Sequence, residues 1–201
     1  MTRVRPCGDR ALLLEVDDVH GTVRALRAAP PPGVLEVVPG AATVLVTHGP
    51  GTGVADLTRA LLALEPLPAA DAATALVTIA VVYDGADLHD VADLTGLSVD
   101  EVVARHRAPS YEVAFCGFAP GFAYLRGLDP RLVVPRLGMP RTRVPAGSVA
   151  VADSWTAVYP RESPGGWRLL GRTDAVLWDL GRPSPALLTP GTRVRFVEGA
   201  S

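Results

Sequence analysis

Two arginines in one extended stretch are the side chains of this 201-residue sequence best suited to bind a ligand. Arg141 and Arg143 lie between Pro140 and Pro145, and each proline restricts the backbone beside it. On an extended segment, side chains two residues apart point to the same side. Paired guanidinium groups can hold a carboxylate or a phosphate through parallel hydrogen bonds. The pattern predicts an anion-binding pair, and a solvated edge strand is the alternative.

The charge of the surrounding stretch favours the same interpretation. Residues 111–173 contain 8 arginines and 4 acids, a local net charge of +4, whereas the whole chain has a net charge of −2. A local excess of positive charge favours an anionic small ligand or an acidic partner surface. The overall negative charge argues against nucleic-acid binding, which needs a dominant basic surface.

A turn with aromatic walls comes before the arginine pair. Phe118, Pro120, Gly121 and Tyr124 combine a sharp proline–glycine turn with large rings, so we expect them to contact a substrate. A buried aromatic cluster is the alternative.

A second glycine-rich loop follows the arginine pair. The backbone N–H groups of Gly165 and Gly166 can face a ligand, and Trp167 beside them can act as a lid or a plug. Further predicted contacts flank these loops: Ser148, Tyr159, Ser163, Arg172 and Thr173.

His106 is the one histidine that we place in the candidate site. It ends a predicted helix just before residue 111, where it could titrate or form a hydrogen bond, although a favourable interaction with the helix dipole is the commoner role. No histidine has metal-ligand spacing with another histidine or a cysteine, so we expect no metal site. Neither Ser148 nor Ser163 has a histidine nearby in sequence, which favours turn hydrogen bonds over nucleophilic catalysis.

Three missing residue types limit the chemistry further. The sequence has no lysine, asparagine or glutamine. It therefore cannot form a Schiff base, carry covalent biotin on a lysine or complete a phosphate-binding P-loop. An oxyanion hole would need backbone N–H groups, hydroxyl groups or arginine. The glycine-rich loop 48–53 accordingly predicts a flexible turn rather than a nucleotide site.

The elements that must position these residues fall into an α+β arrangement. Residues 1–83 predict a ferredoxin-like β-α-β-β-α-β domain, with helices between its strands. Its predicted strands are Ala11–Val16, Val34–Val38, Thr43–Thr47 and Ala75–Val82.

Residues 84–109 predict a helical connector, in which Ser98 and Glu101 form a capping box. Its acidic exposed faces argue against a DNA-binding helix-turn-helix. Residues 110–201 predict a β-barrel of short strands, and one of these covers Ala175–Leu180.

Cellular location follows from two absences. No apolar leader follows Met1, and the longest apolar run, Ala75–Val82, is far shorter than the roughly 20 residues of a membrane span. The two cysteines fit a reducing compartment. We therefore expect a cytoplasmic protein that does not bind membranes.

Three sequence blocks resemble the 5-oxoprolinase B-subunit family, which is also called allophanate hydrolase subunit 1. They read GFAPGFAYL, PRTRVPAGSVAVA and YPRESPGGWRLLGRT, in the family's order. The family includes the sporulation-kinase inhibitor KipI and part of the urea carboxylase carboxyltransferase domain. The resemblance implies a ferredoxin-like domain followed by a cyclophilin-like barrel. Ala123 and Thr192 depart from the family pattern, which often has proline and aspartate there.

The resemblance also implies a function. The chain would be the B subunit of an ATP-dependent 5-oxoprolinase, inactive alone, which opens 5-oxoproline to glutamate together with the C and A subunits of that enzyme. ATP would be shared with these partners, and Arg141, Arg143, Arg172 and His106 would serve catalysis. Two alternatives remain: an inhibitor of a histidine kinase, like KipI, and half of a biotin-dependent carboxyltransferase whose partner supplies the biotinyl lysine.

Overall fold

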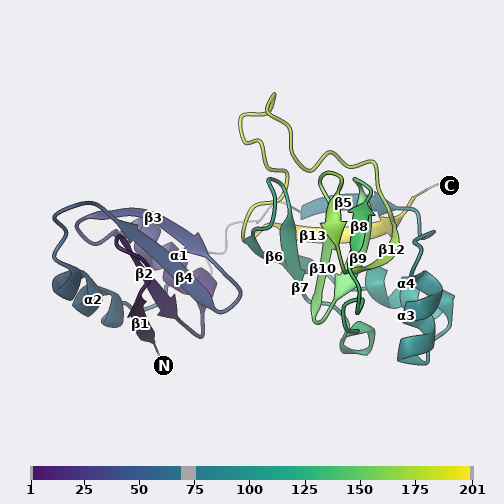
Figure 1. Ribbon diagram of the computed structural model, residues 1–201, viewed down its shortest axis with the longest axis horizontal. Helices are drawn as coiled ribbons and strands as arrows, with labels where there is room; N and C mark the ends of the chain where they lie inside the picture. Colours follow the sequence, from purple (N-terminus) through teal and green to yellow (C-terminus); the bar gives the residue numbers. More distant parts are fainter. Residues whose placement is uncertain (1, 69–75, 200–201) are drawn as a thin grey trace. The chain divides into compact units, whose positions relative to one another are not determined.

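The computed structural model describes residues 2–68 and 76–199, and the chain forms two compact units, Met1–Ala73 and Thr74–Ser201 (Figure 1). Among the described residues, no helix is long and apolar enough to cross a membrane. The fold is of the mixed α+β type, as the sequence predicted.

The first unit is a four-stranded antiparallel sheet covered by two helices. Its strand order is β1-β2-β4-β3. Alternate residues of the central strands, such as Leu12 and Val44, pack against apolar residues of the helices, such as Leu26 and Leu57. Asp18 caps the first helix through the Gly21 N–H, at 2.8 Å. The elements are β1 (Arg3–Pro6), β2 (Ala11–Glu15), α1 (Val19–Ala28), β3 (Val34–Pro39), β4 (Thr43–His48) and α2 (Val54–Leu62).

The prediction that Ala75–Val82 completes this sheet is wrong. The strand found there, β5 (Leu76–Val81), pairs in parallel with β13 (Arg193–Glu198) of the second unit. Its buried residues Ile79 and Val81 belong to the core of that unit, so burial there decides its place. The short strand β1 takes the edge position beside β2. The helices predicted as a connector also belong to the second unit.

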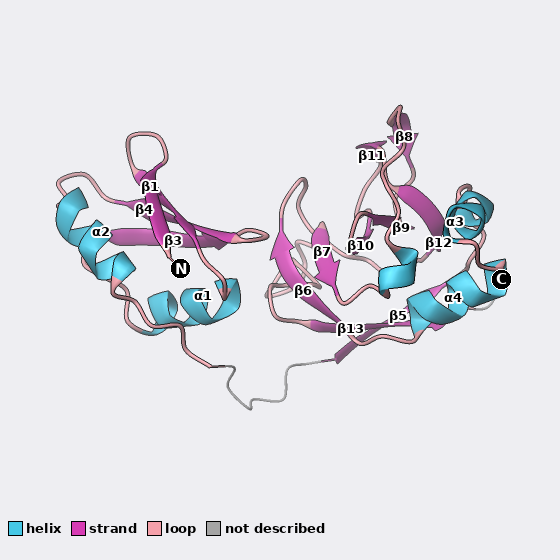
Figure 2. Cartoon of the chain, turned by 90° about the horizontal axis from the view of Figure 1, so that it is seen from below, coloured by secondary structure: helices cyan, strands magenta, loops and turns pink. Residues whose placement is uncertain are grey.

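The second unit is built on a seven-stranded sheet with the order β12-β9-β10-β7-β6-β13-β5. The sheet curves until its two edge strands meet, where Val82 and Arg172 exchange backbone hydrogen bonds of 2.9 and 2.8 Å. The result is a nearly closed barrel. A separate two-stranded ribbon, β8–β11, projects from it (Figure 2). The remaining strands are β6 (Tyr111–Cys116), β7 (Ala123–Arg126), β8 (Arg141–Val144), β9 (Ser148–Ala152), β10 (Trp155–Val158), β11 (Ser163–Gly165) and β12 (Arg168–Arg172).

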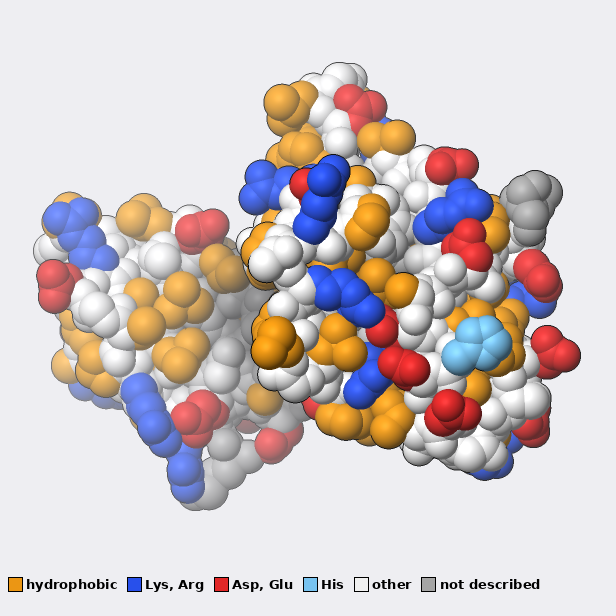
Figure 3. Space-filling model, turned by 45° about the vertical axis from the view of Figure 1, so that its right-hand side comes forward, with side chains coloured by type: hydrophobic (Ala, Val, Ile, Leu, Met, Phe, Trp, Pro, Cys, Tyr) orange, Lys and Arg blue, Asp and Glu red, His pale blue; other side chains and the backbone are white. Residues whose placement is uncertain are grey.

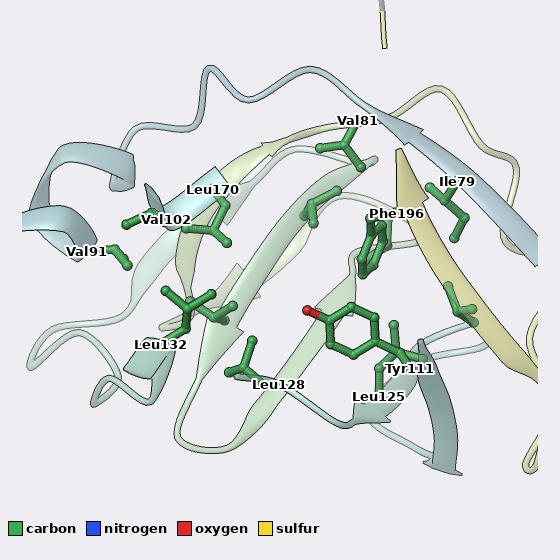
Figure 4. Close-up of a cluster of buried hydrophobic side chains, with 14 of the residues drawn as sticks. Ile79, Val81, Val91, Val102, Tyr111, Leu125, Leu128, Leu132, Leu170 and Phe196 are labelled. Atoms are coloured by element: carbon green, nitrogen blue, oxygen red, sulfur yellow. The ribbon is translucent and has the colours of Figure 1, made fainter. Parts of the chain in front are cut away.

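The barrel interior holds the larger hydrophobic core. Side chains of β5, β6 and β13, including Ile79, Tyr111 and Phe196, pack toward one another inside it (Figure 4). Val91 and Val102 join this core from α3 (Leu88–Thr95) and α4 (Val99–Arg107). The predicted capping box of Ser98 and Glu101 is present at the start of α4 and is confirmed.

The predicted strand Ala175–Leu180 is replaced by part of a long loop. Only an isolated bridge between Trp178 and Ala186 interrupts this loop, which is drawn in yellow-green at the top of Figure 1. Val176, Trp178 and Leu180 are exposed and Leu177 between them is buried. Apart from that bridge the run pairs with no described neighbouring strand, so the predicted strand is not formed. The run presents alternate apolar side chains to solvent.

Candidate functional site

The aromatic turn between β6 and β7 contains one of the two described non-glycine residues with a positive φ angle. Phe118 has a φ angle of +66°, which is unusual for a residue with a side chain, and its side chain is 59% exposed. Gly121 has a φ of +82°, and its Cα lies against Pro160 and Trp178. Backbone strain and an exposed aromatic ring at one position are features of functional sites.

Below this turn lies a cluster of aromatic rings in edge-to-face contact. Phe122 lies 5.3 Å from Tyr159 and 5.7 Å from Trp167, measured between ring centroids. Tyr124 lies 5.6 Å from Trp167. Trp167 is only 4% exposed, so in this conformation it is a buried plug and not a lid. The alternative interpretation of the turn, a buried aromatic cluster, therefore describes Phe122, Tyr159 and Trp167, whereas Tyr124 is partly buried and Phe118 is exposed.

The β8–β11 ribbon brings Arg141 to the same corner of the molecule. Gly165 of β11 is opposite Arg141 of β8, and a Cβ atom on Gly165 would clash with the Tyr159 hydroxyl group. The Tyr159 ring in turn lies 6.4 Å from the exposed Phe118. We call these four residues, Phe118, Tyr159, Gly165 and Arg141, the aromatic corner. Burial raises the pKa of Tyr159, so its hydroxyl group stays a neutral hydrogen-bond donor.

The two predicted anion-binding arginines hold separate carboxylates. The Nη2 atom of Arg141 donates to Asp87 at 2.6 Å, and Asp87 also accepts the Leu169 N–H at 2.7 Å. The Nε atom of Arg143 lies 2.7 Å from Glu162, in a pair that is exposed to solvent. Arginines beside acidic side chains are visible on the face in Figure 3. The two guanidinium groups thus do not converge on one point here.

One donor of Arg141 nevertheless remains without a partner. Its Nη1 atom is buried and forms no hydrogen bond to any described residue. A buried, unpaired donor costs free energy, roughly 1–3 kcal/mol. Of the predicted arginines, Arg141 is therefore the one that has a buried hydrogen-bond donor left without a described partner.

His106 lies in the core, away from this corner. It is fully buried, and its ring stacks on Phe196 at 4.7 Å. The Thr156 hydroxyl group donates to the Ala150 carbonyl, so it accepts from His106 Nε2 at 2.9 Å. Nδ1 then accepts from the Tyr83 hydroxyl group at 2.8 Å. Both ring nitrogens are satisfied inside the barrel, and this placement does not support the prediction of a catalytic His106.

Acid should therefore destabilise the protein through His106. Burial lowers its pKa to about 3 from the usual 6.5. The unfolded chain binds this proton first, so stability from the neutral ring is complete above pH 6.5 and is lost as the pH falls. Between pH 7 and pH 5 we expect a loss of about 2 kcal/mol in the free energy of unfolding.

Denaturant titrations at the two pH values measure this loss. His89→Gln is the control, because His89 is exposed, and it should leave the loss unchanged. A free energy of unfolding that is equal at pH 7 and pH 5 would contradict the buried, neutral His106.

The other predicted contacts are scattered. Ser148 is buried and donates to the Pro145 carbonyl at 2.8 Å, a turn hydrogen bond. The Ser163 hydroxyl group, on β11, is buried without a hydrogen-bond partner among the described residues. Gly166 packs on Pro140 next to the ribbon, and Pro120 is exposed in the aromatic turn.

Arg172 and Thr173 lie at the place where the barrel edges meet, and not at the aromatic corner. The Nε atom of Arg172 donates to Asp84 at 2.8 Å. The Thr173 N–H donates to the Gly147 carbonyl at 2.9 Å. The predicted site residues thus form one group at the corner, one at the barrel edge and one isolated histidine.

Sequence reasoning missed two residues at the corner. Asp87 is only 3% exposed in its side chain and fixes Arg141, whereas the sequence placed it among the acidic residues of an exposed helical face. Arg136 lies over the Trp167 ring, 5.8 Å from its centroid, and no motif in the sequence indicated it.

The described residues indicate neither a metal site nor a phosphate site in the glycine-rich loop of the first unit. Residues 2–68 and 76–199 hold no cluster of three metal-ligating side chains. The glycine-rich loop of the first unit lines a cavity of about 490 Å³, but Asp56 also lines it and would oppose a phosphate group.

Comparisons with known proteins place the chain in a family. Residues 2–188 match the family model described as carboxyltransferase domain, subdomain C and D. The 5-oxoprolinase B subunit of Escherichia coli O157:H7 is 41% identical over 86% of this chain and 82% of its own length. The one from Bacillus subtilis is 43% identical over 61% of this chain and 52% of its own.

Solved structures agree with the fold. The crystal structure of the protein TTHA0988 is 40% identical, with a TM-score of 0.83 over 96% of this chain, which spans 41% of that longer protein. The urea carboxylase of Kluyveromyces lactis is 18% identical to this chain, with a TM-score of 0.75. The match covers 99% of this chain and 22% of the urea carboxylase chain, and it shows a common fold. The predicted resemblance is confirmed: the chain belongs to the carboxyltransferase-domain family of subdomains C and D, together with the 5-oxoprolinase B subunits.

Proposed function

We propose that this chain is the B subunit of an ATP-dependent 5-oxoprolinase, which opens 5-oxoproline to glutamate in a cytoplasmic complex with the C and A subunits. The observation that carries the proposal is the 41% identity to a 5-oxoprolinase B subunit over most of both chains. We extend the proposal to the finer fold, in which a cyclophilin-like barrel follows a ferredoxin-like unit whose edge strand is β1 and not the predicted Ala75–Val82.

The aromatic corner is the part of the chain that we assign to the substrate. The exposed ring of Phe118 offers an apolar wall to a small ring, and the neutral Tyr159, which is only 2% exposed, packs behind that wall. The unpaired Nη1 of Arg141 is buried, so a ligand would have to uncover it before it could donate to a carboxylate or a phosphate. These groups bind and orient a small anion and exclude water from one of its sides.

Proton transfer needs groups that the corner does not have free. The carboxylates next to it, Asp87 and Glu162, are each paired with an arginine. The sequence holds no lysine or side-chain amide. ATP, when bound, would activate the lactam, and the arginines of this chain fit the negative charge of ATP. Because this chain lacks the lysine of a P-loop, we place ATP against another protein of the complex. The isolated chain should therefore be inactive.

The family name supports a second candidate, half of a biotin-dependent carboxyltransferase. In that case the biotinyl lysine must come from another chain, because this sequence has no lysine. A carboxyltransferase would use a biotin carrier and no 5-oxoproline, so one assay separates the two.

The test is reconstitution with the C and A subunits of the same host. We expect 5-oxoproline-dependent ADP release only when all three proteins are present, with at least a hundredfold less from this chain alone. Mixtures that lack this chain, or that contain proline in place of 5-oxoproline, are the controls. Turnover by the isolated chain, or an inactive mixture in which the three proteins are shown to be folded, would refute the proposal.

A further inference from the structure

The barrel of the second unit is closed at one end of the line between its two sheet edges. β5 and β12 are the two edges of the sheet, and Val82 and Arg172 join them through two backbone hydrogen bonds. At this end, Gly85 and Asp87 also donate to the Leu170 and Leu169 carbonyls, at 3.1 and 3.0 Å. Gly171 lies so close at this point that a Cβ atom would clash with the Val82 carbonyl. We call the line along which these two edges face each other the seam.

Beyond this point the seam opens. The Thr173 N–H turns to the Gly147 carbonyl, at 2.9 Å, and the Thr173 hydroxyl group accepts the Ala175 N–H at 3.2 Å. This local turn directs the chain away from β5 instead of continuing the ladder. A cavity of about 300 Å³ results, and the following residues line it: Thr78, Ile79, Ala80, Val82, Arg172, Thr173, Asp174, Ala175 and Gly199.

Unpaired backbone groups of β5 face this cavity. In a strand, the N–H and C=O of one residue point to the same side, and the next residue points to the other. Val82 faces β12, whereas Val81 faces the other neighbour, since its carbonyl accepts the Gly199 N–H at 2.9 Å. The backbone N–H and C=O groups of Thr78 and Ala80 therefore point into the seam, on the same side as those of Val82. No described residue forms a backbone hydrogen bond with Thr78 or Ala80 on that side.

The borders of the seam are apolar as well as unpaired. Leu76 of β5 is 49% exposed, and Val176, beyond the turn at Thr173, is 55% exposed. An open edge with apolar side chains is a template for another strand, and proteins normally cover such edges. At the closed end of the seam, Arg172 is paired with Asp84. A second carboxylate, that of Asp174, lines the cavity.

We propose that the seam binds an extended, mainly apolar segment from another protein of the complex, which adds a strand to β5. The segment would bond to the backbone of Thr78 and Ala80, place apolar side chains on Leu76 and Val176, and set a neutral polar residue near Arg172, whose charge Asp84 already balances. The solved relative, in which 41% of a single chain matches this protein, shows that more polypeptide can be attached to this fold. The occupant rests on the proposed function, because it belongs to that complex.

Amide-resolved hydrogen exchange on the reconstituted complex tests the proposal. In the free chain, the amides of Thr78 and Ala80 should exchange faster than those of Val77 and Ile79, which face β13. On addition of the C and A subunits, exchange at Thr78 and Ala80 should slow at least tenfold, with no comparable change at Val77 and Ile79.

A proline substitution provides the matched experiment. Ala80→Pro removes an N–H that points outward from an edge strand, where proline is tolerated, and should weaken assembly at least tenfold. Ala80→Val keeps the N–H and should assemble like the parent. A thermal melt shows whether the proline variant folds, and if it does not, the exchange measurement on the unchanged chain decides.

The possible results distinguish a failure of the proposed strand addition from a failure of the proposed enzymatic function. Assembly without slower exchange at Thr78 and Ala80, or no assembly at all, would overturn the proposed strand addition. Slower exchange in the free chain as its own concentration rises would assign the seam to a second copy and also overturn it. Slower exchange on assembly in a complex that does not hydrolyse ATP with 5-oxoproline would leave the seam standing and refute the proposed function.

Discussion

Replacing Trp167 with alanine should lower the free energy of unfolding of the second unit by about 3–5 kcal/mol. The indole ring is 4% exposed and contacts Phe122 and Tyr124 edge to face, with ring centroids 5.7 and 5.6 Å away. Its removal leaves a cavity that these rigid rings cannot fill, and it also removes the cation–π contact of Arg136.

Chemical denaturation followed by tryptophan fluorescence measures this loss. All three tryptophans lie after residue 150, so the fluorescence reports on the second unit. Trp178→Ala is the matched control: its side chain is 39% exposed in a loop, and the expected loss is about 1 kcal/mol or less. Trp167→Phe, which keeps a ring, should lie between the two. A Trp167→Ala variant as stable as the parent would show that the ring is a lid and not a plug.

Much of the fold followed from local patterns in the sequence. The capping box at Ser98 and the alternation along Thr43–His48 depend on neighbours only a few residues away, so both could be predicted. The failures concern long-range pairing. β5 is apolar enough for either unit, and only its parallel partner β13, more than a hundred residues later, decides its place. β1 is a short strand with two arginines and a proline, which hides it from propensity.

The candidate site shows the same limit. Phe118 and Gly165 were predicted because glycine, proline and aromatic residues shape loops, Tyr159 was predicted as a contact that flanks these loops, and the structure brings the three together. Spacing along β8 placed Arg141 and Arg143 on one side, but it could not show that each has its own carboxylate. Full burial of His106 depends on β10 and β13, to which a helix-end motif gives no clue.

The second large effect concerns Asp87, the carboxylate that holds Arg141. Asp87→Ala should lower the free energy of unfolding by about 3 kcal/mol, because it leaves the Arg141 guanidinium and the Leu169 N–H without their acceptor. The Asp87 side chain is 3% exposed, but that of Arg141 is 29% exposed, so water can reach part of the cation, and we expect the lower end of the range for buried pairs. Asp87→Asn should cost less, since an amide oxygen can still accept one N–H.

Arg141 and Arg143 lie on the same strand, β8, so a comparison of the Arg141–Asp87 and Arg143–Glu162 ion pairs isolates the effect of burial on stability. Glu162→Ala breaks the exposed pair with Arg143 and should change stability by about 0.5 kcal/mol or less. In a double-mutant cycle, Asp87→Ala and Arg141→Ala should be coupled by at least about 1 kcal/mol, and Glu162→Ala and Arg143→Ala by much less. Equal costs for Asp87→Ala and Glu162→Ala would mean that solvent screens both pairs. Arg141 would then be no more fixed than Arg143, and the aromatic corner would lose the one cation that its geometry holds in place.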